Sequence, residues 1–193
     1  MGIVIWIAEG TWPACVDAAR ERARDDEELT LAHVTDPAPA QAAHAVFGGL
    51  LGRGRAGRDP GARLEELSAT AAGELLDAAA RRLGRPARRR ELSGRVEREI
   101  VRAAEGADLL VCARDGDRER LGPHSLGPAT RFVVDHAPCP VLLVWPQAAP
   151  DVDSLPEPPP KPPGPHHPPP GPPPPEPPHR PGPPPPPPAA PGV

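Results

Sequence analysis

The sequence predicts a three-layer α/β domain followed by a proline-rich tail. Short apolar runs alternate with amphipathic helical patterns over the first 148 residues, which indicates parallel strands joined by helical crossovers. Strands covered on both faces of a parallel sheet are continuously apolar, as residues 141–145 are. Of the 35 prolines, 24 lie between Pro156 and Pro191, where they exclude helices and sheet ladders. We therefore expect a folded domain over residues 1–148 and a disordered tail over residues 149–193.

The amino-terminal half contributes two strands and two helices. Residues 3–8 and 29–34 are apolar runs of strand length. A helix from residue 12 to about residue 24 lies between them, and Thr11 stands at its N-cap position. The clearest amphipathic helix covers residues 61–83, where alanine and leucine recur at intervals of three and four.

The remaining elements complete an alternating pattern of five strands and four helices. They are a strand over residues 87–93, a helix over 95–105, a strand over 109–112, a helix over 129–136 and a strand over 141–145. The first of these strands carries Arg88, Arg89 and Arg90, which favours a sheet edge, where charge discourages pairing with other chains. The alternative is a nucleic-acid patch, which we disfavour because no aromatic residues are interleaved with the arginines.

The segment between residues 36 and 60 gives the least definite pattern. Residues 38–51 are compatible with a short helix, and residues 48–58 then alternate glycine with arginine. A glycine-rich loop with arginines can hold phosphate, but this spacing matches no P-loop. We interpret residues 48–58 as a lid or a plain flexible loop.

The last third of the domain resembles the universal stress protein family. The resemblance is carried by an Ala-Asp-Leu strand start at residue 107, a glycine-containing loop, and residues 136–141, which read His-Ala-Pro-Cys-Pro-Val. It extends to the first two strands and covers roughly the first 146 residues. It implies a Rossmann-like parallel sheet of order 3-2-1-4-5 and a stress-response or regulatory module.

The resemblance also implies an adenine nucleotide site, with ATP as the expected ligand, at the carboxyl end of the sheet. In open α/β sheets, ligands bind at this end because backbone N–H groups and a helix N-terminus point into the crevice. The residues that correspond to such a site in this chain are Ala8, Glu9, Val34, Ala113, Arg114, Gly116, Gly127 and Thr130.

The loop departs from the family pattern in ways that weaken phosphate binding. In the family, the loop has two glycines separated by two residues and a third glycine nine residues later. Here Ala113 stands in place of the first glycine, ten residues rather than nine separate Gly116 from Gly127, and Glu9 replaces an aspartate that follows the first strand. Pro128 replaces a serine or threonine and thereby removes both a hydroxyl and an N–H donor. Because the Thr130 hydroxyl and nearby arginines offer partial compensation, both nucleotide binding and its loss remain open.

Other chemical readings of the same region are weaker. Ser125 has no G-x-S-x-G context, and no base can be assigned to it. The acids at 115, 117 and 119 lack the spacing of a calcium loop, and His136 with Cys139 would need two further zinc ligands. We therefore predict neither a metal site nor an enzyme. Weak ATP hydrolysis on the same fold is an alternative to the nucleotide-binding module and to the nucleotide-free scaffold.

Composition restricts the environment and the partners. The net charge of −4 indicates neither nucleic acid nor membrane as a partner. The first residues contain neither a signal sequence nor a membrane span, so we expect a cytoplasmic protein. Cys15, Cys112 and Cys139 are three in number and lack C-x-x-C spacing, which favours buried, reduced thiols.

The tail and the last strand are the predicted interaction surfaces. The tail favours extended polyproline II and contains many P-x-x-P motifs for a protein partner, although any proline run contains them. Weak metal binding by His166, His167 and His179 is the less favoured reading. The resemblance implies a homodimer through the strand from Val141 to Trp145. If the loop has lost nucleotide, the protein is an interaction scaffold that uses the dimer surface and the tail.

Overall fold

The computed structural model describes residues 2–51 and 59–155. The chain divides into one compact unit, Met1–Glu157, and a second, Pro158–Val193, and the account below concerns the first. Of the predicted tail, residues 149–193, the first seven are described and include a 3₁₀ turn over Val152–Ser154. The part of the tail from residue 156 onward lies outside the described residues, as does most of the predicted glycine–arginine loop. Within the described part, no helix combines the length and the apolar character that a membrane crossing requires.

Five parallel strands form one sheet in the order β3-β2-β1-β4-β5, as the resemblance implied. The strands are β1 (Gly2–Trp6), β2 (Glu28–Thr35), β3 (Arg88–Ser93), β4 (Leu109–Ala113) and β5 (Val141–Val144). The central pairs are β1 with β2 and β1 with β4, in which Ile5 lies opposite Leu31 and Val111. All three of these side chains are fully buried, so the apolar runs read from the sequence form the centre of the sheet.

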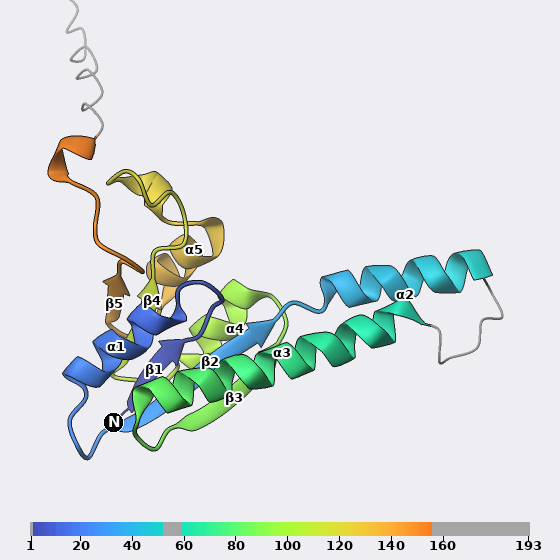
Figure 1. Ribbon diagram of the computed structural model, residues 1–193, viewed down its shortest axis with the longest axis horizontal. Coiled ribbons are helices and arrows are strands. Elements are labelled where there is room, and N and C mark those ends of the chain that lie inside the picture. The colour runs from blue at the N-terminus through green and yellow to red at the C-terminus, as the bar shows by residue number, and fades with distance from the viewer. Residues whose placement is uncertain (1, 52–58, 156–193) are drawn as a thin grey trace, which may run out of the picture. The chain divides into compact units, whose positions relative to one another are not determined.

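The described residues form five α-helices where the sequence showed four clear patterns. They are α1 (Trp12–Arg22), α2 (Ala38–Leu51), α3 (Pro60–Leu83), α4 (Val96–Ala103) and α5 (Pro128–His136). The additional helix, α2, is the segment that the sequence left as a possible short helix. Figure 1 shows α2 beside α3, with both helices extending past the sheet.

Two apolar clusters cover the two faces of the sheet. On one face, α1 and α3 pack on alternate residues of the central strands, among them Ile3, Ile5 and Leu31. On the other, α4 and α5 contact the intervening residues, including Val4 and Ala32. The three-layer architecture follows from this alternation, because successive strand residues point to opposite faces.

The arginine-rich strand β3 lies at a sheet edge, which confirms the expectation drawn from its charges. Its residues 88–90 are exposed. Arg88 lies 3.7 Å from a carboxylate oxygen of Glu28, and Arg89 pairs with Asp77 of α3. These arginines are therefore partly neutralised by neighbouring acids of the same domain.

The ends of the helices follow the expected chemistry in one case and not in another. The Asp59 side chain accepts a hydrogen bond of 2.8 Å from Gly61 N and caps α3, and Gly84 ends that helix at φ 66°. Thr11 occupies the N-cap position of α1, but its hydroxyl makes no capping bond. It donates instead to the carbonyl oxygen of Ala8 at 3.3 Å, so Thr11 closes the turn after β1 rather than capping the helix.

Candidate functional site

The chain changes direction across the sheet between β1 and β4, which makes their carboxyl ends the expected ligand position. The connection that leaves β1 forms α1 on one face, whereas the connection that leaves β4 leads to α5 on the other. Two loops that diverge in this way open a crevice between adjacent strands. The sequence placed its nucleotide site at this point.

The crevice exists but is almost filled. Its walls consist of six residues: Trp6, Ala8, Thr11, Ala113, Asp115 and Thr130. Its volume is only about 20 Å³, room for roughly one water molecule, whereas small-molecule sites commonly measure about 300–1,000 Å³. Thr11 and Thr130 are buried there. Side chains of the domain therefore occupy the space that a ligand would need.

Asp115 occupies the anion position at the start of α5. Its Oδ1 accepts a hydrogen bond of 2.7 Å from the backbone N–H of Gly127, the N-cap residue of that helix. A carboxylate is stabilised there by the partial positive charge of a helix N-terminus, as a phosphate would be. The next residue, Pro128, has no N–H, so the N–H of Gly127 is the donor available to Asp115 at this point.

The two loop glycines allow close packing within the loop. The N–H of Gly116 donates to the carbonyl oxygen of Ser125 at 3.0 Å, and that of Asp117 donates to His124 at 2.8 Å. A Cβ at position 116 would lie 2.2 Å from the His124 carbonyl oxygen. At Gly127 a Cβ would lie 2.8 Å from the Asp115 carboxylate. Both glycines therefore have structural reasons to be present without any phosphate.

The arginine expected to bind phosphate is engaged inside the domain. The Arg114 guanidinium lies 4.8 Å from the centre of the Trp145 ring and donates to the Ser125 hydroxyl. Ser125 is buried and donates its own proton to the carbonyl oxygen of Gly122 at 2.6 Å. These contacts join the β4–α5 loop to the residue after β5 and leave Ser125 poorly placed as a nucleophile.

The structure distributes the eight predicted site residues over four environments. Ala8, Ala113 and Thr130 line the crevice, and Arg114, Gly116 and Gly127 belong to the closed loop beside it. Val34 is buried on the face covered by α4. Glu9 is exposed and lines a separate cavity with His33 and Thr35.

Sequence reasoning missed Asp115, Thr11 and Trp6 as parts of the crevice. The sequence showed Asp115 only as one of three acids that lack calcium-loop spacing, although an acid two residues after a strand, in a loop that leads to a helix starting Gly-Pro, is a recognisable signal. The described residues contain no group of three or more His, Cys, Asp or Glu side chains placed to hold a metal ion.

Two of the three cysteines, Cys15 and Cys112, are buried in the core, whereas Cys139 is only partly buried. Burial raises the pKa of Cys15 and that of Cys112 to about 12, and nearby Asp115 adds to the effect on Cys112. Neither thiol is suited to act as a nucleophile at neutral pH.

Comparison with protein families identifies one whose pattern this domain matches. The pattern of the Universal stress protein family matches residues 9–144. Comparison with curated protein sequences finds no match.

Solved structures agree on the fold. The structure of the hypothetical protein MJ0577 is 20% identical with a TM-score of 0.56, and the match covers 77% of this chain and 97% of that one. A universal stress protein in complex with cAMP is 17% identical with a TM-score of 0.50, covering 76% and 98%. Universal stress protein UspA from Lactobacillus plantarum is 20% identical with a TM-score of 0.49, covering 74% and 96%.

Proposed function

Because the chain belongs to the universal stress protein family, we propose that it is a stress-response regulatory module that binds an adenine nucleotide when Asp115 leaves the β1–β4 crevice. The carboxylate and a nucleotide phosphate compete for the same N–H group of Gly127 at the start of α5. Nucleotide affinity is therefore low while Asp115 holds its position, and a change that moves Asp115 raises it.

The hydrogen bond between Asp115 and Gly127 is the observation that carries this proposal. It supports an anion position at the switch point of the sheet, in a fold whose relatives include a protein crystallised with cAMP. Asp115 is also one of the residues that line the small crevice, and a phosphate cannot share its position because the two anions repel each other.

Titration calorimetry with ATP, AMP and cAMP tests the proposal on the wild type and on Asp115→Ala. The variant frees the Gly127 N–H and removes a negative charge, so we expect nucleotide to bind about tenfold more tightly. Asp117→Ala is the matched control, since it removes the same charge from an exposed position in the same loop. If neither variant binds nucleotide at millimolar concentration, the nucleotide-free scaffold is the correct alternative.

We propose that the module is regulatory rather than catalytic. The only proton of the Ser125 hydroxyl is donated to the Gly122 carbonyl oxygen, and Arg114 already contacts that hydroxyl. Steady release of ADP or AMP by purified protein, in proportion to protein concentration and altered in Asp115→Ala, would contradict this assignment.

We also propose a homodimer through β5. This strand is at the edge of the sheet, and its four residues, Val141–Val144, are aliphatic and only partly buried. An apolar edge strand favours a symmetric pairing of identical strands. We expect sedimentation at micromolar concentration to give a dimer in the wild type and a monomer in Leu143→Lys, and a wild-type monomer would contradict the proposal.

A further inference from the structure

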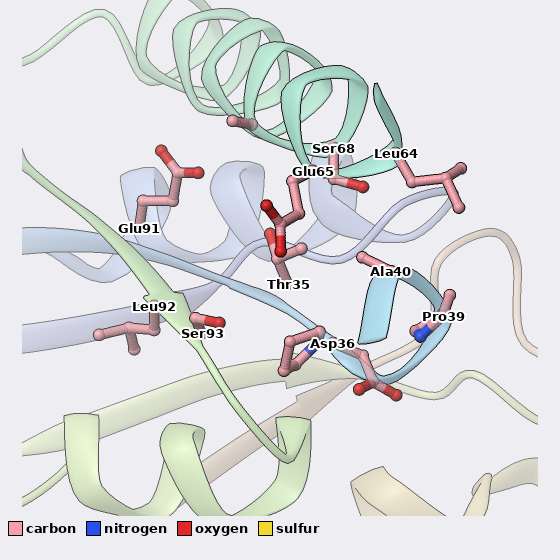
Figure 2. A pocket seen from close by; sticks show the side chains of 12 residues that line it. Thr35, Asp36, Pro39, Ala40, Leu64, Glu65, Ser68, Glu91, Leu92 and Ser93 are labelled. Carbon is pink, nitrogen blue, oxygen red and sulfur yellow. The ribbon is translucent and has the colours of Figure 1, made fainter. Parts of the chain in front are cut away.

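A cavity of about 490 Å³ lies between α3 and the carboxyl ends of β2 and β3, on the β2 side of the sheet. Its volume is within the range of small-molecule sites. Figure 2 shows it bordered by the start of α2, by Leu64, Glu65 and Ser68 of α3, and by the end of β3. The crevice between β1 and β4 shares none of its lining residues.

Strand alternation explains which side chains reach this cavity. Leu29 and Leu31 of β2 pack on the face covered by α3, so Thr35, an even number of residues further, belongs to that face as well. Thr35 pairs with Ser93 of the neighbouring strand β3. Leu92 packs on the opposite face, and Figure 2 shows it leaving β3 on the other side from Glu91. Glu91 and Thr35 therefore face α3.

Among the described residues, the hydroxyl oxygen of Thr35 is the buried side-chain polar atom that lacks a hydrogen-bond partner. It is buried and accepts or donates no hydrogen bond within the described residues. A buried hydroxyl without a partner costs about 1–3 kcal/mol, and few such groups persist in native proteins. This oxygen exposes less than 1 Å², so a ligand group that displaces the side chains covering it would supply the missing hydrogen bond.

The charge of the lining selects the kind of ligand. Asp36, Glu65 and Glu91 border the cavity, and its lining contains no lysine, arginine or histidine. Asp36 accepts a hydrogen bond of 2.9 Å from Ala38 N, and Glu65 lies 3.3 Å from His44 Nε2. Within the described residues Glu91 makes no salt bridge. Three carboxylates repel phosphate and attract ammonium groups.

A second cavity continues the same acidic surface. It has a volume of about 470 Å³ and shares Thr35 and Ser68 with the first. Two further carboxylates, Glu9 and Glu74, line it together with His33. The Nδ1 of His33 lies 2.8 Å from the carbonyl oxygen of Ile7, so this nitrogen carries the proton that is donated there. Because the two cavities adjoin, together they can accommodate a long ligand that carries charges at several points.

We propose that this acidic cleft, formed by the two cavities around Thr35 and Ser68, binds an organic cation with several amino groups. One ammonium group is held between Glu91 and Glu65, and its N–H donates to the Thr35 hydroxyl oxygen. The methylene chain between amino groups packs on the small side chains of α3, among them Ala69 and Ala72. The site is independent of the nucleotide proposed for the β1–β4 crevice.

Titration calorimetry with spermidine at low ionic strength tests the proposal on the full chain. We expect Glu91→Gln to weaken binding about fivefold and Thr35→Val to weaken it about tenfold, because the first removes a solvent-exposed charge and the second a buried acceptor. Ser68→Leu places a larger side chain at the junction of the two cavities and should abolish binding. Glu105→Gln is the control, since it removes an equal exposed charge from the connection between α4 and β4. That connection lies at the amino ends of the strands, whereas the cleft lies at their carboxyl ends.

The variants distinguish a built site from general attraction to an acidic protein. Thr35→Val does not change the net charge, so a loss of affinity in that variant together with unchanged binding by Glu105→Gln supports the cleft. The proposal is overturned if wild-type protein does not bind spermidine at 10 mM. It is also overturned if Ser68→Leu binds as the wild type does, or if Glu105→Gln weakens binding as much as Glu91→Gln.

Discussion

The β1–β4 crevice and the acidic cleft beside β2 lie along the same edge of one sheet, but they differ in how far the chain satisfies its own polar groups. In the loop beside the crevice, the Gly127 N–H, the Gly116 N–H and the Ser125 hydroxyl all have partners from the same loop. In the cleft, the Thr35 hydroxyl has none within the described residues. The comparison indicates that the position typical of ligands in such folds is closed here, whereas its neighbour is open.

The largest expected effect concerns the close packing that keeps the crevice shut. In Gly116→Ala the new Cβ would lie 2.2 Å from the His124 carbonyl oxygen, which is backbone and cannot give way cheaply. We expect the free energy of unfolding to fall by about 3 kcal/mol, measured by urea denaturation.

The matched control for this substitution is Gly73→Ala in α3. A Cβ there meets nothing within 4 Å, and alanine favours helix, so stability should rise by about 0.5–1 kcal/mol. Equal effects of the two substitutions would contradict the view that Gly116 serves close packing.

A smaller effect tests the unsatisfied hydroxyl of the cleft. Thr35→Val replaces a buried hydroxyl without a partner by a methyl group of similar size, so the free energy of unfolding should rise by about 1 kcal/mol. Thr30→Val in the same strand should change it by less than about 0.5 kcal/mol. A loss of stability in Thr35→Val would mean that the hydroxyl has a partner, and the cleft would lose its main argument.

The smallest effect concerns the pair formed by His44 of α2 and Asp59, the N-cap residue of α3, beside the cleft. The hydrogen bond of 2.6 Å to Asp59 raises the pKa of His44 above its ordinary value of 6.5, and Glu65 adds to this shift. A raised pKa in the folded state means that the pair stabilises the fold fully below pH 6.5. The contribution is lost as the pH rises through the folded-state value.

Melting temperatures at two pH values measure this contribution. We expect the difference between wild type and His44→Gln to be larger at pH 5.5 than at pH 8.5. A difference of equal size at both pH values would show that the stabilisation by the His44–Asp59 pair does not depend on the charge of His44.

Most of the fold could be predicted from the sequence because it depends on local patterns. The sequence predicted every strand end within two residues, and the arginines of residues 88–90 predicted the edge position of β3. The helix over residues 61–83 was recognisable from its periodicity, and its start at Pro60 differs by a single residue. Helix α2 was less definite, since it contains Gly48 and Gly49 and is apolar on average.

The candidate site could be located from the sequence, but its state could not. The strand ends, Gly127 and Thr130 were correctly placed at one edge of the sheet. Nothing in the spacing showed that Gly116 approaches His124, or that Arg114 lies over the Trp145 ring. These contacts join residues eight to thirty-one positions apart, and the fold of an irregular loop decides them.

By itself, the sequence determined the α/β class and the order of the elements along the chain, because these follow from hydrophobic periodicity and from the alternation of strands and helices. The sheet order, and with it the switch point between β1 and β4, was what the family resemblance implied. Only the tertiary structure decided which groups meet at the carboxyl edge. There the carboxylate of Asp115 accepts a hydrogen bond from Gly127 at the N-terminus of α5. Three other carboxylates line a cavity around Thr35, because α3 and β3, distant from β2 in the sequence, fold against the end of that strand.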